Sequence, residues 1–503
     1  MNIYIYIAVI LFIAARCSFK YHRSRTTQAV VLVVAAICLY ESVLSICQLL
    51  GLSLSPSIYF AFTGSFMNPG PLGGLLSVCA SILIAYYLFG DNTVIKNICL
   101  AVFLLAVIIL PATGSRSANL ALSVSLFLIA LKTERGKRLF RKYWMPLLCV
   151  AVTVGIVLYI VKKPSADGRF FMNKISMRAM LDNGVLGAGS GHFSGTYGSE
   201  QADYFMSQTD PENGFPDLTS ISEHERLTAE CPDRAYNDFF RIGVEYGPIA
   251  MLLFVAVMVL SIVKSYKNTN VFCYGLVSFA VFACFSYPLN FAVFMFLLSV
   301  CLATCIPFVK ADKLLSGSSY TIVAVACVCA ILFHEIPEMR IDRTVRKECG
   351  RIMKKYNAGY YDYVVENSHK VFENEQDNVE FMYAYGRSLH MTGDYEKSDS
   401  ILTLCTKLSC DPMIWNIMGN NSLALGHFSE AEEKYRYAFY MVPNRLYPLT
   451  LLAKLYHTEG DTVSFLDMAA KIETFKPKVE SFHTEHLRRE IMDIKAGYGV
   501  IND

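Results

Sequence analysis

Apolar stretches of about 20 residues recur through the first two-thirds of this chain, and they constrain its fold more than any other feature. Each is long enough to cross a hydrocarbon layer about 30 Å thick as a helix. Of the 503 residues, 54% are hydrophobic and 17% charged, whereas a soluble domain is about a quarter charged. We therefore predict an all-α, polytopic membrane domain with about ten transmembrane helices. The predicted spans are residues 2–15, 28–50, 71–90, 94–111, 117–131, 143–161, 244–263, 271–287, 290–309 and 318–334.

Lysine and arginine are concentrated in alternate loops between these stretches. Cytoplasmic loops retain positive charge during insertion, so the basic loops predict the orientation of the chain. They follow the first, fifth, seventh and ninth spans. We therefore expect four regions to lie on the far side of the membrane: residues 51–70, 112–116, 162–243, and everything after residue 335. The basic residues of the first span follow it in the sequence, which favours a membrane anchor over a cleaved signal peptide.

After residue 335 the apolar runs give way to mixed charge with helical periodicity, which predicts a membrane domain over 1–335 and a second domain over 336–503. Turn glycines recur there every 33 or 34 residues. They are Gly359, Gly393, Gly426 and Gly460. This period is typical of tetratricopeptide (TPR) helical hairpins, so we predict a TPR-like α-solenoid. Its groove is expected to bind a protein partner or an acceptor, with a rigid spacer as the alternative.

The loop 162–243 is the only long hydrophilic segment among the spans, and loops of that size are usually functional or disordered. Residues 181–193 are rich in glycine, which predicts tight turns that bring backbone amides near a ligand. The strand, helix and lysine of a nucleotide-binding loop are missing, so that function is rejected. The many acids of residues 200–233 are expected to form a solvated lid.

Three arginines on the predicted outer side are candidate phosphate ligands: Arg116, Arg169 and Arg178. An arginine near a bilayer surface is costly unless it is paired or used. Each of them alone is explained by snorkelling to headgroups or by pairing with a local acid. Together they suit a diphosphate, because guanidinium groups match phosphate oxygens and stay charged.

Most cysteines lie inside the spans, and no C-x-x-C framework is present. Cys231, Cys349, Cys405 and Cys410 are expected in an oxidising compartment, but their spacing does not specify a disulfide. The sequence predicts no metal site, no cofactor and no nucleic-acid partner.

Four separated patches share their order and spacing with one known family. They are Phe66, Met67, Asn68, Pro69; Ser115, Arg116, Ser117, Ala118; Gly168, Arg169 with residues 187–193; and Asn237, Asp238, Phe239, Phe240 with Glu245, Gly247 and Ile249. In these patches the chain resembles the bacterial O-antigen ligase and polymerase family, over roughly residues 60–310. Those enzymes move glycans from undecaprenyl diphosphate to an acceptor.

The resemblance implies that Arg116, Arg169 and Arg178 hold the diphosphate and that Asn68 and Asn237 contact substrate. Tyr236 stands where the family usually has a histidine thought to serve catalysis. The general base is therefore open among His192, His224, Asp238 and Glu245, and Tyr236 is a candidate for positioning the acceptor. A second departure is ten apparent spans instead of the usual twelve.

The leading hypothesis is a metal-independent glycosyltransferase of the bacterial inner membrane, with the large loop and the C-terminal domain in the periplasm. Lipid A core, a growing polysaccharide or a protein hydroxyl is the acceptor, the last as in O-linking oligosaccharyltransferases. A polysaccharide transporter or flippase predicts polar residues inside the spans, where Glu41 is the main example. A non-enzymatic assembly scaffold predicts that substitution of Arg116 or Arg169 leaves the phenotype intact.

Overall fold

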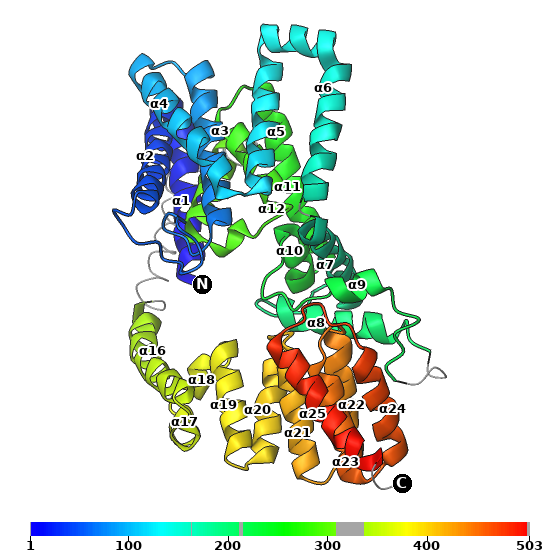
Figure 1. Ribbon diagram of the computed structural model, residues 1–503. Helices are drawn as coiled ribbons and strands as arrows, with labels where there is room; N and C mark the ends of the chain where they lie inside the picture. Colours follow the sequence, from blue (N-terminus) through cyan, green and yellow to red (C-terminus); the bar gives the residue numbers. More distant parts are fainter. Residues whose placement is uncertain (1, 162, 211–214, 308–335, 500–503) are drawn as a thin grey trace. The chain divides into compact units, whose positions relative to one another are not determined.

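The computed structural model describes residues 2–161, 163–210, 215–307 and 336–499, and every regular element in those ranges is a helix (Figure 1). Its contacts divide the chain into two compact units. The first comprises residues 1–162, 236–239 and 250–339, and the second comprises 163–235, 240–249 and 340–503.

The first unit contains the long apolar helices. These are α1 (Asn2–Tyr21), α2 (Arg23–Leu49), α3 (Pro69–Phe89), α4 (Thr93–Ile109), α5 (Arg116–Lys132), α6 (Glu134–Val161), α11 (Pro248–Lys267), α12 (Phe272–Ala283) and α13 (Ala292–Cys305). Two short 3₁₀ turns join them, η1 (Pro111–Thr113) and η3 (Pro288–Asn290).

Nine of the ten predicted spans lie on helices, and the tenth, residues 318–334, lies outside the described residues. Five helices have the length and hydropathy of a membrane span: Tyr4–Tyr21, Arg23–Leu49, Pro69–Phe89, Thr93–Thr113 and Pro248–Lys267. A sixth is the pair Arg116–Lys132 and Glu134–Pro146, if the two are counted together across a bend of 109°. The chain is thus a multi-pass membrane protein, with five or six such spans in the described residues where the sequence predicted about ten.

Local backbone chemistry explains where the predicted spans and the helices differ. Thr133 ends α5 in an extended conformation, and its hydroxyl accepts a hydrogen bond from Gly136 N at 3.0 Å, which starts the next helix in a new direction. The span predicted at 244–263 begins instead at Pro248, because Gly247 has a φ of 88° and proline lacks the N–H that a continuing helix needs. The helices α12 and α13 have only 12 and 14 residues and are separated by the turn at Pro288.

Helix α3 is the centre of the first unit, where it contacts α2, α4, α5 and α12. Most of its side chains are buried, and Leu72, Leu75 and Leu76 are fully so. Gly74 lets α12 approach closely, since a Cβ there would lie 2.2 Å from the ring of Phe282. Burial all round a helix is typical of a core element, and the N-terminal end of α3 lies beside the start of α5.

The second unit contains the large loop and the C-terminal helices. In the loop lie α7 (Lys163–Asp182), α8 (Phe193–Met206) and α9 (Glu223–Thr228), followed by α10 (Asp238–Tyr246), whose first residues belong to the first unit. The C-terminal helices are α16 (Ile336–Asn357), α17 (Tyr361–Ser368), α18 (Phe372–Glu375), α19 (Val379–Met391), α20 (Tyr395–Thr406), α21 (Pro412–Ala424), α22 (Phe428–Met441), α23 (Tyr447–Glu459), α24 (Thr462–Thr474) and α25 (Phe482–Gly499).

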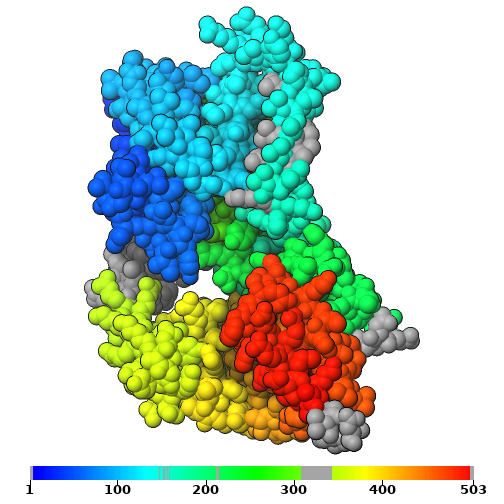
Figure 2. Space-filling model, in the orientation of Figure 1, coloured from blue at the N-terminus to red at the C-terminus, as the bar shows by residue number. Residues whose placement is uncertain are grey.

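The C-terminal helices form successive hairpins in which α19 packs on α20, α21 on α22 and α23 on α24, and each hairpin contacts the next. Gly393, Gly426 and Gly460 lie at the turns of these three hairpins, and Gly359 lies between α16 and α17; all four have φ between 79° and 87°. Figure 2 shows the surface of these hairpins running without a break from yellow to red. The structure therefore confirms a helical C-terminal region, and its assignment to the TPR class stays a prediction from the sequence period.

The large loop packs with the C-terminal hairpins in one compact unit, where the sequence assigned it to the membrane domain. Helix α8 lies against α22 (Figure 1). A disulfide joins Cys231 of the loop to Cys410, which lies between α20 and α21. Small residues on α8 permit this packing: a Cβ on Gly195 would lie 2.2 Å from Lys407 O, and one on Gly198 would lie 2.5 Å from Cys410 Cβ.

Candidate functional site

Residues 183–191, named here the glycine loop, cap the C-terminal end of α10. Ala188 N donates to Val244 O at 2.8 Å, and Gly189 N donates to Glu245 O at 2.9 Å. The last carbonyls of a helix have no partner inside it, so the loop supplies the missing donors. These two amides are used within the chain, which corrects the expectation that the glycines aim them at a ligand.

Two glycines allow the glycine loop and α10 to come this close. Gly187 and Gly247 have φ values of 71° and 88°, which side chains rarely adopt. A Cβ on Gly187 would lie 2.5 Å from Gly247 N, and one on Gly247 would lie 1.8 Å from Val185 O. Glycine is therefore needed at positions 187 and 247, because the backbones of the loop and of α10 are in contact there.

Glu245 is the buried carboxylate of this arrangement, with 7% of its surface exposed. Its Oε1 accepts from Gly191 N at 3.2 Å. Burial raises the pKa of this carboxyl, while the positive charge of Arg241, one turn earlier on α10, acts in the opposite direction. A carboxyl with a raised pKa can hold or accept a proton nearer to neutral pH than an exposed one.

His192 follows the glycine loop directly and precedes the first residue of α8. Its Nδ1 lies 3.1 Å from Ser190 O. A carbonyl oxygen only accepts, so Nδ1 carries the proton and Nε2 presents the lone pair. The side chain is partly exposed, and its charge acts on Glu245. His192 and Glu245 therefore lie in one local environment.

Helix α7 carries two of the predicted arginines, nine residues apart. Arg169 is partly exposed near the start of the helix. Arg178 donates through Nε to Glu200 Oε1 at 2.7 Å, and its guanidinium lies 5.3 Å from the ring centre of Tyr204. Pairing with a local acid was the alternative weighed for each arginine, and Arg178 has such a partner.

The remaining histidine candidate of the loop, His224, lies 2.9 Å through Nε2 from Asp167 Oδ2. Lys174 on α7 contacts Glu225 at 2.7 Å, one residue further on. Sequence reasoning missed Lys174, although its spacing of four residues from Arg178 on a helix was a usable signal. These pairs tie α7 to α9.

In the first unit, Asn68 and Arg116 open two neighbouring helices. Asn68 caps α3 by accepting from Gly70 N at 2.8 Å. Arg116 is the first residue of α5 and is partly exposed. Gly73 brings the two helix starts together, since a Cβ there would lie 3.1 Å from Ser115 Cβ. The N-terminus of a helix favours anions, so Arg116 adds its charge where the backbone already attracts one.

The last three candidate site residues, 236–238, lie at the start of α10. Tyr236 is 38% exposed and packs edge-on against Tyr287 at 5.4 Å. Asn237 accepts from Phe239 N at 3.0 Å and starts the helix. Asp238 is fully buried, and its Oδ2 accepts from Leu289 N at 2.8 Å. The bond to Leu289 gives Asp238 a structural part within the first unit, where it holds residues 236–239 to the turn at Pro288.

The structure thus brings the predicted residues together in three local groups. Asn68 and Arg116 lie at the starts of two helices in contact, Tyr236, Asn237 and Asp238 lie at the start of α10, and His192 and Glu245 lie beside the glycine loop. The described residues hold no group of three or more His, Cys, Asp or Glu side chains arranged to bind a metal ion. Arg241, which lies one turn from Glu245 and whose charge acts on it, belongs with the last group.

Comparison with known proteins identifies one family. A family model described as O-antigen ligase matches residues 101–255. That segment holds Arg116, Arg169, Arg178, the glycine loop and α10, and it ends before the C-terminal hairpins. No curated protein and no solved structure matches the chain. Residues 101–255 of this multi-pass membrane protein are therefore similar to the O-antigen ligase family.

Proposed function

We propose that this protein transfers a glycan from undecaprenyl diphosphate to an acceptor hydroxyl, on lipid A core or on a growing polysaccharide. The match of residues 101–255 to the O-antigen ligase family carries the proposal. The segment it covers contains the cations and the carboxylate that such a reaction needs. Enzymatic activity, the donor, the acceptor and independence from metals are all part of the proposal, and the family match supports the first of them.

The diphosphate of the donor is already a good leaving group, so the protein mainly has to neutralise its charge and orient the acceptor. We assign the first task to Arg116 and Arg169. Arg178 uses Nε for Glu200, so its two terminal NH₂ groups are the part of the side chain that can donate to phosphate. Asn68 and Asn237 are proposed to contact the substrate.

We propose His192 as the general base. Its Nδ1–H is bonded to Ser190 O, so Nε2 can take the proton of the attacking hydroxyl. Glu245 then stabilises the imidazolium that forms, and it is the alternative base because burial raises its pKa. The bond to Leu289 makes Asp238 a weaker candidate. Tyr236 keeps a proposed role in positioning the acceptor.

The proposed location is the bacterial inner membrane, with the large loop and the C-terminal hairpins in the periplasm. The alternation of basic loops supports this orientation. The disulfide between Cys231 and Cys410 supports it independently, since such bonds persist in oxidising compartments.

Protein O-glycosylation is the second candidate function. A cavity of about 710 Å³ in the second unit favours it, because this cavity lies on the helical hairpins and is mostly apolar. Met413, Asn416 and Tyr447 are among its lining residues. A peptide acceptor or a partner protein is the ligand proposed for this cavity.

The deciding experiment is transfer in vitro from a labelled undecaprenyl diphosphate glycan by the purified protein. Arg169→Ala should lower turnover on the order of 10²-fold, since loss of one preorganised donor to developing charge has that effect. Arg343→Ala, at an exposed arginine of α16, is the matched control and should turn over like wild type. Equal turnover by wild type and Arg169→Ala would remove the assigned role.

The choice of acceptor separates the remaining hypotheses. Modification of lipid A core or polysaccharide supports the main proposal, and modification of a Ser/Thr peptide alone supports protein glycosylation. A flippase would move the labelled lipid across a vesicle bilayer without transferring its glycan. A scaffold would show neither activity.

A further inference from the structure

The large loop and the C-terminal hairpins exchange a dense set of bonds to backbone carbonyls. Arg226 of α9 is 5% exposed and donates to Pro443 O at 3.3 Å and Lys476 O at 3.0 Å. Its guanidinium also lies 5.0 Å from the ring centre of Phe475. In the opposite direction, the amide of Asn444 donates to Arg226 O at 3.1 Å and Ala229 O at 2.7 Å.

These bonds are reciprocal and buried, which makes them costly to break. A buried guanidinium that loses its partners pays the full desolvation cost of its charge. Burial lowers the pKa of Arg226, because it removes water from the charged guanidinium. The hydrogen bonds to Pro443 O and Lys476 O replace that water. Asn444 is also buried, with 6% of its surface exposed, and its amide would likewise lose its hydrogen-bond partners if the loop moved away.

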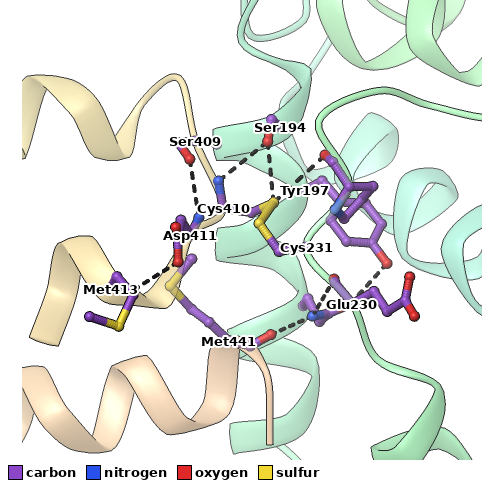
Figure 3. Close-up of a disulfide and its surroundings, with 12 residues drawn as sticks. Ser194, Tyr197, Glu230, Cys231, Ser409, Cys410, Asp411, Met413 and Met441 are labelled. Atoms are coloured by element: carbon purple, nitrogen blue, oxygen red, sulfur yellow. Dashed lines mark hydrogen bonds between the residues drawn. A yellow bond between two sulfur atoms is a disulfide. The ribbon is translucent and has the colours of Figure 1, made fainter. Parts of the chain in front are cut away.

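The disulfide between Cys231 and Cys410 lies beside Ser194 of α8, as Figure 3 shows. Ser194 Oγ contacts Cys410 Sγ at 3.2 Å, and Cys410 N lies 3.3 Å from the same hydroxyl. Gln201, 1% exposed, donates to Glu230 O at 3.1 Å and to Met441 O. Helix α8 is therefore fixed to the hairpins at its first turn and again two turns later.

The start of α8 is also where the proposed base lies. His192 precedes α8 directly, and Gly191, the residue before it, donates to Glu245. A shift of α8 would move His192 and break the bond that holds the glycine loop to Glu245. The hairpins thus act on these two side chains through the start of α8.

We propose that the C-terminal hairpins are the positioning half of the catalytic site, and that Arg226, Asn444 and the disulfide Cys231–Cys410 are its positioning residues. The chain's own loop is the ligand of this face of the hairpins. This inference rests on the proposed function only in assigning catalysis to His192 and Glu245. It predicts that activity depends on the oxidised state of one cysteine pair.

The test compares oxidised and reduced protein in detergent. An added dithiol converts the disulfide into two thiols and itself becomes a cyclic disulfide. Hydrogen exchange of the α8 amides measures whether the helix loosens, and kcat per folded molecule measures the catalytic effect. On reduction, wild type should exchange faster at 193–206 and lose kcat on the order of 10²-fold, the cost of misplacing groups by about 1 Å.

The control variants separate positioning from loss of fold. The double variant Cys231→Ser with Cys410→Ser should no longer respond to the dithiol, whereas Cys349→Ser, at a buried cysteine of α16, should respond like wild type. Asn444→Ala and Arg226→Met should lower kcat in oxidised protein. Arg226→Lys should restore part of it by donating to one carbonyl, and Asn367→Ala, at an amide bonded to Tyr363 O in its own helix, should have no effect.

Each result decides the inference. Faster exchange together with lower kcat supports it. Unchanged exchange, or faster exchange at unchanged kcat, overturns it. If wild type transfers no glycan at all, the proposed function fails. Hydrogen exchange alone then shows whether the disulfide and the hairpins hold α8 in place.

Discussion

Glu245 shows how burial of one side chain links the candidate site to pH. Its raised pKa means that the folded state holds the proton more tightly than the unfolded chain does. Ionisation of this carboxyl therefore costs folding free energy, and the cost grows as the pH rises from its ordinary value of 4.5 through the raised one.

Glu245→Gln keeps the acceptor for Gly191 N and removes the ionisation. Relative to this variant, wild type should lose stability as the pH rises above about 4.5, and the difference should level off once the folded carboxyl is ionised. Thermal unfolding of both proteins at a series of pH values measures it. A difference that stays constant with pH would contradict the assignment.

In the transfer assay, His192→Gln should lower turnover more than Glu245→Gln does, by a factor on the order of 10² to 10⁴ for loss of a base.

At the scale of elements, the contact between the glycine loop and α10 depends on the absence of side chains. Gly187→Ala places a Cβ 2.5 Å from Gly247 N, where only backbone can yield. Overpacking and a strained φ should together destabilise the second unit by about 2 to 5 kcal/mol. Gly184→Ala is the matched control, because its φ of 72° is similar but nothing lies within 4 Å of the added carbon.

Gly184→Ala should therefore cost only the left-handed strain, about 1 to 2 kcal/mol. Chemical denaturation, followed by a probe in the second unit, gives both values. Equal effects of the two substitutions would mean that the loop does not lie against α10.

The helical elements were largely predictable, and their partners were not. The 33- or 34-residue period located Gly359, Gly393, Gly426 and Gly460, because hairpin turns demand positive φ and that demand is local. The glycine loop was predicted from its high glycine content. Glycine indicates only that another group comes close to the backbone, and in the structure that group is α10. The break at Gly247 and Pro248 was visible in the sequence and was overridden by the apolar run that follows it.

Long-range pairing set the limit of sequence reasoning. The bond between Cys231 and Cys410 joins residues 179 apart, and four cysteines on the same predicted side allowed several pairings. Arg178 and Glu200 likewise form a pair that no local pattern indicates. Hydropathy measures apolar length and does not show where a helix breaks. Helix α12 ends at Ala283 and α13 begins at Ala292, with the turn at Pro288 between them, so among the described residues neither reaches the length of a span.

At the scale of the whole molecule, the basic loops predict which parts of the chain meet the cytoplasm. Val463, 80% exposed on α24, should lie on the opposite side of the membrane from Arg135 in the basic start of α6. A membrane-impermeant maleimide added to spheroplasts should label Val463→Cys, whereas Arg135→Cys should react only after the membrane is opened. Wild type gives the background from native cysteines, and the reverse pattern would invert the proposed orientation.

The separation of the disulfide partners also sets the timing of biosynthesis. Cys231 leaves the ribosome 179 residues before Cys410, which at about 5 to 20 residues per second is an interval of roughly 10 to 35 seconds. During that interval the loop is a nascent segment with a reactive thiol and no hairpin to dock on. In the proposed orientation, newly made protein should therefore be inert until its last hairpins have crossed the membrane, and chains that stop before residue 410 should insert but never form this disulfide.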